Sequence, residues 1–199
     1  GPSMNSSHTL LNLPASIAVD PANGDVYIAD GYGNRRVVVF DRQGRFLRQW
    51  GRQGTLAEVE AGLGGVFFEV VHCVVIGKDG LVYVCDREGH RIEVFDKLGN
   101  FKRNILVEDK TGRLRGEGLV CWTGFSPDPL QKFLFVGGCG TGEIRVLDRA
   151  TGQALSSFGR PGTQVGENGS VHTIAVDSKS NIYVGDSPNR RLQKFRFVK

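Results

Sequence analysis

The sequence predicts an all-β protein made of four copies of one four-stranded antiparallel unit, and two observations carry this prediction. Apolar strands with alternating polar residues recur along the 199 residues, each bounded by Gly, Asp or Asn. The 28 glycines suit a chain with many tight turns, since glycine accepts a positive φ at little cost. Helical periodicity is confined to a short stretch near residues 55–61.

The first two strands of the unit are found by aligning the chain with itself. Each copy holds an apolar strand, a short polar turn and a second apolar strand centred on an aromatic residue. The four copies are "ASIAVDPANGDVYIADGYGNRRVVVF", "VHCVVIGKDGLVYVCDREGHRIEVF", "WTGFSPDPLQKFLFVGGCGTGEIRVL" and "VHTIAVDSKSNIYVGDSPNRRLQKF". Their aromatic residues are Tyr27, Tyr83, Phe135 and Tyr183, which lie 56, 52 and 48 residues apart.

The third strand follows an Asp-led turn and begins with arginine. The turn starts at Asp30, Asp86 and Asp186, with Gly138 in that place in the third copy, and the third strands are predicted at 36–40, 91–95, 145–147 and 191–195. An arginine beside a turn aspartate is typical of a structural ion pair. We therefore expect Arg36, Arg91 and Arg191 to pair with the aspartates of their own copies.

A fourth short strand follows in the first three copies, in "RQGRFLRQWG", "KLGNFKRNI" and "ATGQALSSFG". The glycine at 44, 99 or 152 supplies the hairpin turn. Repeats of roughly 40–50 residues with four strands each are typical of the blades of a β-propeller. The predicted fold is therefore a β-propeller with blades at 14–51, 71–107, 119–159 and 171–199.

The last copy stops after its third strand. The apolar segment "HTLLNL" at 8–13 is expected to supply the missing strand and close the ring, because an open ring leaves strand edges unpaired. A piece of a larger ring is the alternative. Residues 8–199 are predicted to form one domain, and residues 1–7 a tag remnant and flexible N-terminus. Since Gly1–Ser3 look like a protease-cleavage scar, a leader could have been removed, and the compartment stays open.

Composition narrows the class of protein. The net charge is +4 and the pI about 9.0, but arginines fall singly along the chain, which does not favour nucleic acid. No apolar run approaches the length of a membrane span.

The four cysteines, Cys73, Cys85, Cys121 and Cys139, form no CxxC pair. Their place in or beside apolar strands favours buried thiols over disulfides.

Strand geometry gathers four candidate site residues on one face. His72 and His172 begin the first strands of the second and fourth copies, each 11 residues before the aromatic position. Tyr32 and Arg87 lie in turns between second and third strands, which share that face with the starts of the first strands. Two imidazoles could hold zinc or copper, although a catalytic zinc needs a third protein ligand, and His8 is the spare histidine near this face. A hydrogen-bonded structural role for the histidines is the alternative.

The motifs "DGYGNRRVVVF", "VHCVVI" with "VCDREGHRIEVF", and "VHTIAVD" with "YVGD" resemble NHL repeats, and within that superfamily peptidyl-α-hydroxyglycine α-amidating lyase. That zinc enzyme splits a peptidyl-α-hydroxyglycine into an amidated peptide and glyoxylate. The resemblance implies that His72 and His172 match two of its three zinc histidines, Tyr32 its tyrosine base and Arg87 an active-site arginine. The third zinc histidine has no match in this chain.

Three functions follow from this fold and face. The first is a binding scaffold that takes a peptide, protein or small ligand at the channel mouth, as a monomer or homodimer and without a membrane. The second is a zinc-dependent lyase that uses Tyr32, Arg87, His72 and His172. The third is RNA binding, as in the NHL domains of animal tripartite-motif proteins. RNA binding would need a continuous basic face with stacking aromatics, which the dispersed arginines do not favour.

Overall fold

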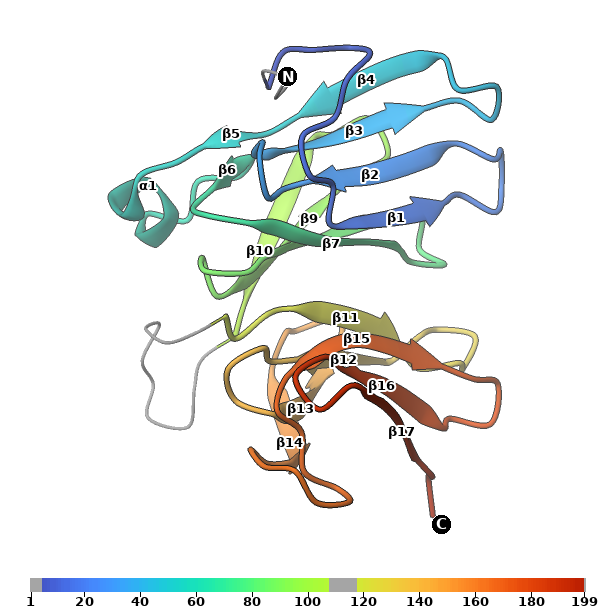
Figure 1. Cartoon of the computed structure of the whole chain (residues 1–199). Helices are drawn as coiled ribbons and strands as arrows, with labels where there is room; N and C mark the ends of the chain where they lie inside the picture. The colour runs from blue at the N-terminus through green and yellow to red at the C-terminus, as the bar shows by residue number, and fades with distance from the viewer. Residues whose placement is uncertain (1–4, 108–117, 199) are drawn as a thin grey trace. The chain divides into compact units, whose positions relative to one another are not determined.

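The computed structural model describes residues 5–107 and 118–198, so Gly1–Ser3 of the predicted tag remnant lie outside it. The chain divides into two compact units, residues 1–105 and 106–199, and each is considered by itself. Four sheets carry the repeats, two in each unit (Figure 1). The described residues include one short helix and no helix long and apolar enough to cross a membrane.

The first unit holds two four-stranded sheets, the first and second blades. The first blade has the order β1-β2-β3-β4, with β1 at Ser16–Val19, β2 at Val26–Asp30, β3 at Arg36–Phe40 and β4 at Phe46–Trp50. The second has the order β10-β9-β8-β7, with β7 at Val71–Ile76, β8 at Val82–Asp86, β9 at Arg91–Phe95 and β10 at Phe101–Leu106. A connection with β5 (Arg52–Gln53), α1 (Leu56–Glu60) and β6 (Val66–Phe67) joins them. Thr55 and Glu58 form a capping box on α1, at the one place where the sequence shows a helical period.

The second unit holds the third and fourth blades. The third blade has the order β11-β12-β13-β14, with β11 at Trp122–Phe125, β12 at Phe133–Gly137, β13 at Glu143–Asp148 and β14 at Ala154–Gly159. The fourth has three strands, β15 at Val171–Val176, β16 at Ile182–Asp186 and β17 at Arg191–Phe195. The predicted four-stranded antiparallel blade is therefore confirmed in three of the four sheets.

Apolar residues between the two sheets of each unit form its core. In the first unit the buried side chains include Tyr27, Val39, Val74 and Phe95, with Trp50 packed against them. In the second they include Phe135, Ile144 and Val184, with Phe158 and Phe195 at the margin. In both units, sheets with alternating inward apolar residues pack face to face, as neighbouring blades of a propeller do.

An Asp–Arg pair organises the first, second and fourth blades, as the sequence predicts; both partners are buried in the first two, while in the fourth Asp186 is buried and Arg191 partly exposed. Asp30 pairs with Arg36 at 2.8 Å, Asp86 with Arg91 at 3.0 Å and Asp186 with Arg191 at 3.1 Å. Each pair also binds the backbone of the segment that leads into its blade. The aspartates accept hydrogen bonds from the backbone N–H groups of Asn12, Phe68 and Gly169, while the arginines donate to backbone carbonyls of the same segments, including those of Leu10, Val59 and Glu167.

This arrangement overturns the predicted ring closure. Residues 8–13 form no strand of the fourth blade, because their backbone is bound to the first blade. The Leu10 carbonyl accepts a hydrogen bond of 2.8 Å from Arg36 Nη2, and Asn12 N donates to Asp30 Oδ1 at 2.7 Å. The backbone carbonyls of Asn5 and Ser7 also accept hydrogen bonds, from Arg36 Nη1. The segment is the entry connection of the first blade, equivalent to the connections that precede β7 and β15.

The expectation of buried thiols is also wrong. Cys73 and Cys85 form a disulfide between directly opposed residues of β7 and β8. Cys121 and Cys139 form a second one, with Cα atoms 5.4 Å apart. Both free cysteine thiols and disulfides can be buried at apolar strand positions, so the sequence pattern could not distinguish the two. The pairing depends on cross-strand register, which places the Cα atoms of Cys73 and Cys85 within 4.8 Å.

Replacing Asp30 by alanine should destabilise the protein by about 3–5 kcal/mol, because it leaves the buried Arg36 guanidinium without its counter-charge. Urea denaturation measures the change. The control is Arg45→Ala, which removes the exposed partner of Asp41 and should leave the unfolding midpoint almost unchanged. Equal changes in unfolding free energy for the two substitutions would show that the buried pair contributes no more to stability than the exposed one.

Stability should fall as pH rises from about 4.5 to about 8, because burial raises the pKa of the Glu93 carboxyl to about 8 and the folded state therefore holds a proton that the unfolded chain has lost. Glu93→Gln should flatten this dependence in pH-dependent thermal unfolding. Gln193 holds the equivalent place in the fourth blade and accepts from Gly166 N as Glu93 accepts from Gly65 N. Gln193 is only half-buried, so Gln193→Glu should introduce a smaller loss of stability in the same direction, and an unchanged pH profile in both variants would contradict this account.

Candidate functional site

His72 and His172 occupy equivalent β-bulges. In the second blade Val71 is opposite Asp86 and Cys73 opposite Cys85, so His72 is the extra residue between them. In the fourth blade the register shifts in the same way between Val171 and Thr173, which makes His172 the extra residue. A bulge re-aims the side chain at the point where strand pairing is broken. Each bulge therefore takes its histidine out of the regular alternation of side chains between the two faces of the sheet.

The turn that carries Tyr32 is fixed against its surroundings. Tyr32 N donates to Leu13 O at 3.2 Å, and Gly33 N donates to Asn12 O at 2.9 Å. Gly31 packs directly on the backbone beside His72, since a Cβ there would lie 1.9 Å from Val71 O. Only glycine permits this approach, and it brings the turn of the first blade onto the start of β7.

Tyr32, His72 and Arg87 meet in the first unit. His72 Nε2 and Tyr32 Oη are 2.9 Å apart, and the two rings pack edge to face with centroids 5.6 Å apart. Arg87 Nη1 donates to Tyr32 Oη at 3.3 Å, and its guanidinium carbon lies 5.5 Å from the centre of the tyrosine ring. His72 is fully buried, whereas Tyr32 is 41% exposed. The expectation that the two turns lie beside the start of β7 is thus confirmed, and the role of these residues remains a prediction.

Glu88 is a member of this cluster that the sequence analysis missed. Its carboxylate accepts hydrogen bonds from Arg87 Nε and from Val70 N, the second at 3.1 Å. Arg87 N in turn donates to Val70 O at 3.0 Å. The ion pair with Glu88 therefore helps to fix the Arg87 guanidinium beside the Tyr32 ring. The signal in the sequence is the acid that directly follows the arginine in "DRE".

The surroundings of His172 differ from those of His72. His172 is half-buried and belongs to the second unit. By alignment, Gly140 replaces Tyr32 in the turn of the preceding blade, and Ser187 replaces Arg87. The spare histidine, His8, is stacked on Phe46 with ring centroids 4.0 Å apart.

Zinc needs more donors than this cluster offers. A catalytic zinc site has three protein ligands, and residues 5–107 and 118–198 contain no group of three His, Cys, Asp or Glu side chains placed to hold a metal ion. In the first unit His72 Nε2 is already engaged by Tyr32 Oη. The donor set seen here does not fit zinc, and we derive no chemical step through a metal.

Comparison with solved structures identifies the fold of this chain. The WD40 β-propeller domain of Doa1 superposes with a TM-score of 0.62 over 91% of this chain and 49% of that one. Its 15% sequence identity makes this a likeness of fold alone. The chain is thus built on the β-propeller fold.

Sequence comparison identifies the repeat. The family model described as NHL repeat matches residues 11–40 and 68–95, so these two segments of the chain are NHL repeats. Peptidyl-glycine alpha-amidating monooxygenase B of Xenopus laevis is 36% identical over 195 residues, which cover 92% of this chain and 20% of that protein. Peptidyl-alpha-hydroxyglycine alpha-amidating lyase 1 of Drosophila melanogaster is 28% identical over 201 residues, which cover 92% of this chain and 34% of that protein. The chain thus spans a minor part of each relative's length.

Replacing Gly31 by alanine should displace the Tyr32 turn from His72, because the new methyl group cannot share space with Val71 O. We expect a loss of about 1–3 kcal/mol in unfolding free energy, as for other overpacked sites, together with a changed NMR resonance of the His72 ring. Gly124→Ala is the control, since its Cβ would meet its nearest neighbour at 3.4 Å. An unshifted His72 signal in Gly31→Ala would refute the contact.

Proposed function

We propose that this chain is a binding scaffold whose recognition surface includes Tyr32, His72 and Arg87 at the loop face of the first two blades. The observation that supports this most is the preformed contact of the three side chains. Hydrogen bonds and close packing fix their backbones, so little conformational entropy is lost when a ligand binds. Residues on loops held by a rigid scaffold are common binding residues.

The chemistry of the cluster favours a ligand with a carboxylate. Arg87 supplies a guanidinium, which recognises carboxylates through its planar array of donors. Tyr32 adds a hydroxyl and a partly exposed ring on which an apolar group can rest. A peptide or a small acylated amino acid carries both of these groups.

A lyase of the amidating type is the second candidate, favoured by the same three residues and by the named relatives. In such a reaction the bond between the amide nitrogen and the hydroxylated carbon breaks, the hydroxyl proton goes to the nitrogen, and the carbon becomes the aldehyde of glyoxylate. Tyr32 would accept the hydroxyl proton and Arg87 would hold the carboxylate. The lyase that the sequence resembles uses zinc, whereas the donors described here do not fit that ion, so Tyr32 and Arg87 are the residues assigned to this step.

One compound tests both candidates. An N-acylated α-hydroxyglycine has the carboxylate and acyl group that the cluster should bind, and its cleavage releases glyoxylate. We expect saturable binding by calorimetry, weakened about tenfold or more in Arg87→Gln through loss of the charged hydrogen bonds. Ser187→Ala, at the equivalent place in the fourth blade, is the matched control and should bind as the parent does.

The outcomes separate the candidates. Binding without glyoxylate release supports the scaffold. Glyoxylate release that disappears on chelation and returns with zinc supports the lyase, and elemental analysis of parent and His72→Ala protein then checks the metal. If binding is absent, or is unchanged in Arg87→Gln, neither assignment of this cluster holds.

A further inference from the structure

The turn that carries Tyr32 is one residue longer than the equivalent turns of the second and fourth blades. Five residues separate the paired aspartate and arginine in the first blade, at 31–35, whereas four residues separate them in the other two, at 87–90 and 187–190. The length of a turn selects the conformation and the hydrogen bonds that can close it. The Tyr32 turn therefore needs hydrogen bonds that differ from those of the shorter turns.

The shorter turns close through a backbone hydrogen bond. His90 N donates to Arg87 O at 3.4 Å, and Arg190 N donates to Ser187 O at 3.2 Å. His90 and Arg190 have positive φ values of 52° and 51°, the left-handed conformation that is typical of the residue after a tight turn between two strands. Each of these two turns is thus closed by its own backbone.

In the first blade the side chain of Arg35 closes the turn. Arg35 holds the equivalent place directly before the third strand, but its N–H donates out of the turn, to Asn5 Oδ1 at 2.8 Å. Its side-chain Nη1 donates to three carbonyl oxygens of the turn, those of Gly31, Tyr32 and Asn34, at 3.1, 3.3 and 2.9 Å. A charged donor, which makes stronger hydrogen bonds than a neutral one, therefore takes the place of the backbone hydrogen bond.

Hydrogen bonds hold the Tyr32 backbone on both sides. The Tyr32 N–H donates to Leu13 O at 3.2 Å, and the Tyr32 carbonyl accepts from Arg35 Nη1 at 3.3 Å. Because the backbone is fixed in this way, the Tyr32 side chain keeps the direction in which its hydroxyl meets His72 Nε2 and Arg87 Nη1. Arg35 therefore provides one of the two backbone supports of the cluster.

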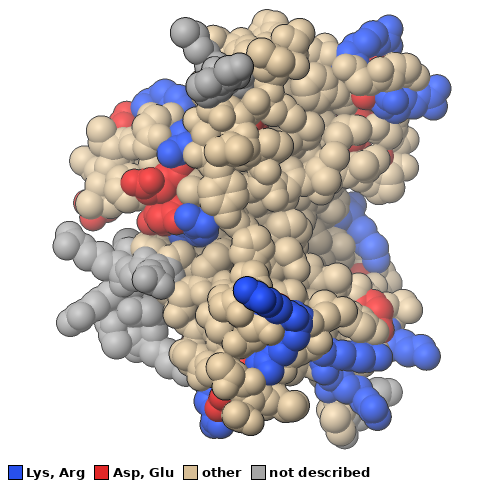
Figure 2. Space-filling view, in the orientation of Figure 1, with Lys and Arg blue, Asp and Glu red and all other residues tan. Residues whose placement is uncertain are grey.

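Charge alone does not distinguish Arg35 from the other basic residues. Lys and Arg side chains are exposed over several parts of the surface in Figure 2. The aspartate of the turn also has its counter-charge already, since Asp30 pairs with the buried Arg36. What sets Arg35 apart is that it donates to the carbonyls of the turn that carries Tyr32.

We infer that Arg35 is a positioning residue for the Tyr32 cluster. Its guanidinium closes the longer turn and thereby holds the Tyr32 hydroxyl against His72 and Arg87, in the arrangement that binds the carboxylate ligand. Such an arrangement, formed before the ligand arrives, reduces the entropy lost on binding. This inference rests on the proposed function for what the cluster binds, whereas the effect of Arg35 on Tyr32 is measured without a ligand.

NMR of the free protein tests the positioning. Arg35→Gln removes the charge and shortens the side chain, so we expect hydrogen exchange at the Tyr32 and Gly33 amides to become about tenfold faster and the His72 ring resonances to shift. Arg35→Lys retains a charged group with three donor hydrogens for the three carbonyls, and it should restore most of the parent spectrum. Arg42→Gln is the matched control, because it removes an exposed arginine from the hairpin between β3 and β4 and should leave these signals unchanged.

Binding of the N-acylated α-hydroxyglycine then measures what the positioning contributes to recognition. We expect Arg35→Gln to weaken binding about tenfold, with partial recovery in Arg35→Lys. If Arg35 acts through Tyr32, Arg35→Gln added to a Tyr32→Ala protein should weaken binding no further, since residues that act as a unit are not additive. Circular dichroism verifies that all variants are folded.

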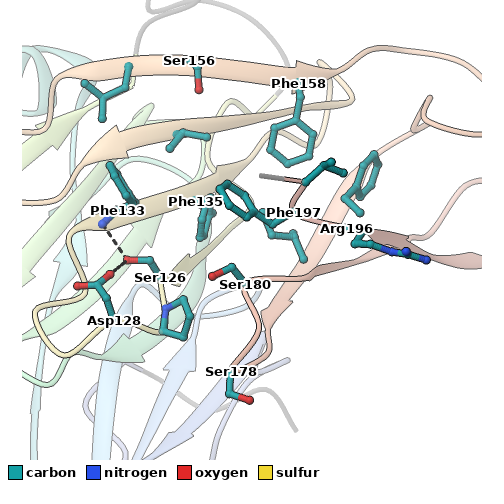
Figure 3. A pocket seen from close by; sticks show the side chains of 16 residues that line it. Ser126, Asp128, Phe133, Phe135, Ser156, Phe158, Ser178, Ser180, Arg196 and Phe197 are labelled. Carbon is teal, nitrogen blue, oxygen red and sulfur yellow. Dashed lines mark hydrogen bonds between the residues drawn. The ribbon is translucent and has the colours of Figure 1, made fainter.

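The apolar cavity of the second unit is another place where the acyl group of this compound fits. The cavity has a volume of about 890 Å³, and Figure 3 shows Phe133, Phe135 and Phe158 in its wall together with Ser156. Ser156→Trp places an indole in the cavity and should leave binding unchanged, because the Tyr32 cluster belongs to the first unit. Loss of binding in Ser156→Trp, without an effect of Arg35→Gln, would locate the compound in the cavity and contradict the inference.

The outcomes separate the positioning role from the proposed function. If the parent protein does not bind the compound, the proposed function fails, and the NMR comparison still decides the role of Arg35. If amide exchange at Tyr32 and the His72 ring signals are the same in Arg35→Gln as in the parent, the positioning role is overturned whatever the parent binds. Equal weakening of binding in Arg35→Gln and Arg42→Gln would also overturn it, because it would show an effect of charge alone.

Discussion

An Asp–Arg pair, fully buried in the first two blades, is the contact on which the rest of this structure depends. In three blades the aspartate ends the second strand, the arginine begins the third, and the two lie opposite each other in the register. The pair does more than neutralise two charges, because it also binds the backbone of the incoming connection. Buried charges are tolerated only when they are paired and fully hydrogen-bonded, so the entry segment and the pair require each other. The entry segment in turn positions the loop face where Tyr32, His72 and Arg87 meet, because it accepts hydrogen bonds from the backbone of the Tyr32 turn.

The Tyr32 cluster arises where the repeat is broken. It uses features that the fourth blade does not share, since the turn of that blade lacks a tyrosine and Ser187 replaces Arg87. The cluster is small, polar and fixed by hydrogen bonds.

Much of the fold could be predicted from the sequence because it rests on local alternation and repetition. The strands at 36–40, 91–95 and 191–195 and the three Asp–Arg pairs agree with the structure, since both follow from the period of the repeat. The placement of residues 8–13 could not be predicted, because an apolar segment fits equally well as an edge strand or as an entry connection. The hydrogen bonds that Arg36 and Asp30 make to the backbone of this segment decide between the two placements. The disulfides and the role of Glu88 depend likewise on register and side-chain direction, which composition does not reveal.

Native-state hydrogen exchange at three backbone amides tests the central claim most directly. Asn12, Phe68 and Gly169 lie outside the strands of their blades, yet their N–H groups donate to the aspartates of the three pairs. If the pairs hold the entry connections, these amides exchange as slowly as those of the neighbouring strands and open together with them. Exchange as fast as that of the exposed hairpin turns, with the strands still protected, would contradict the account.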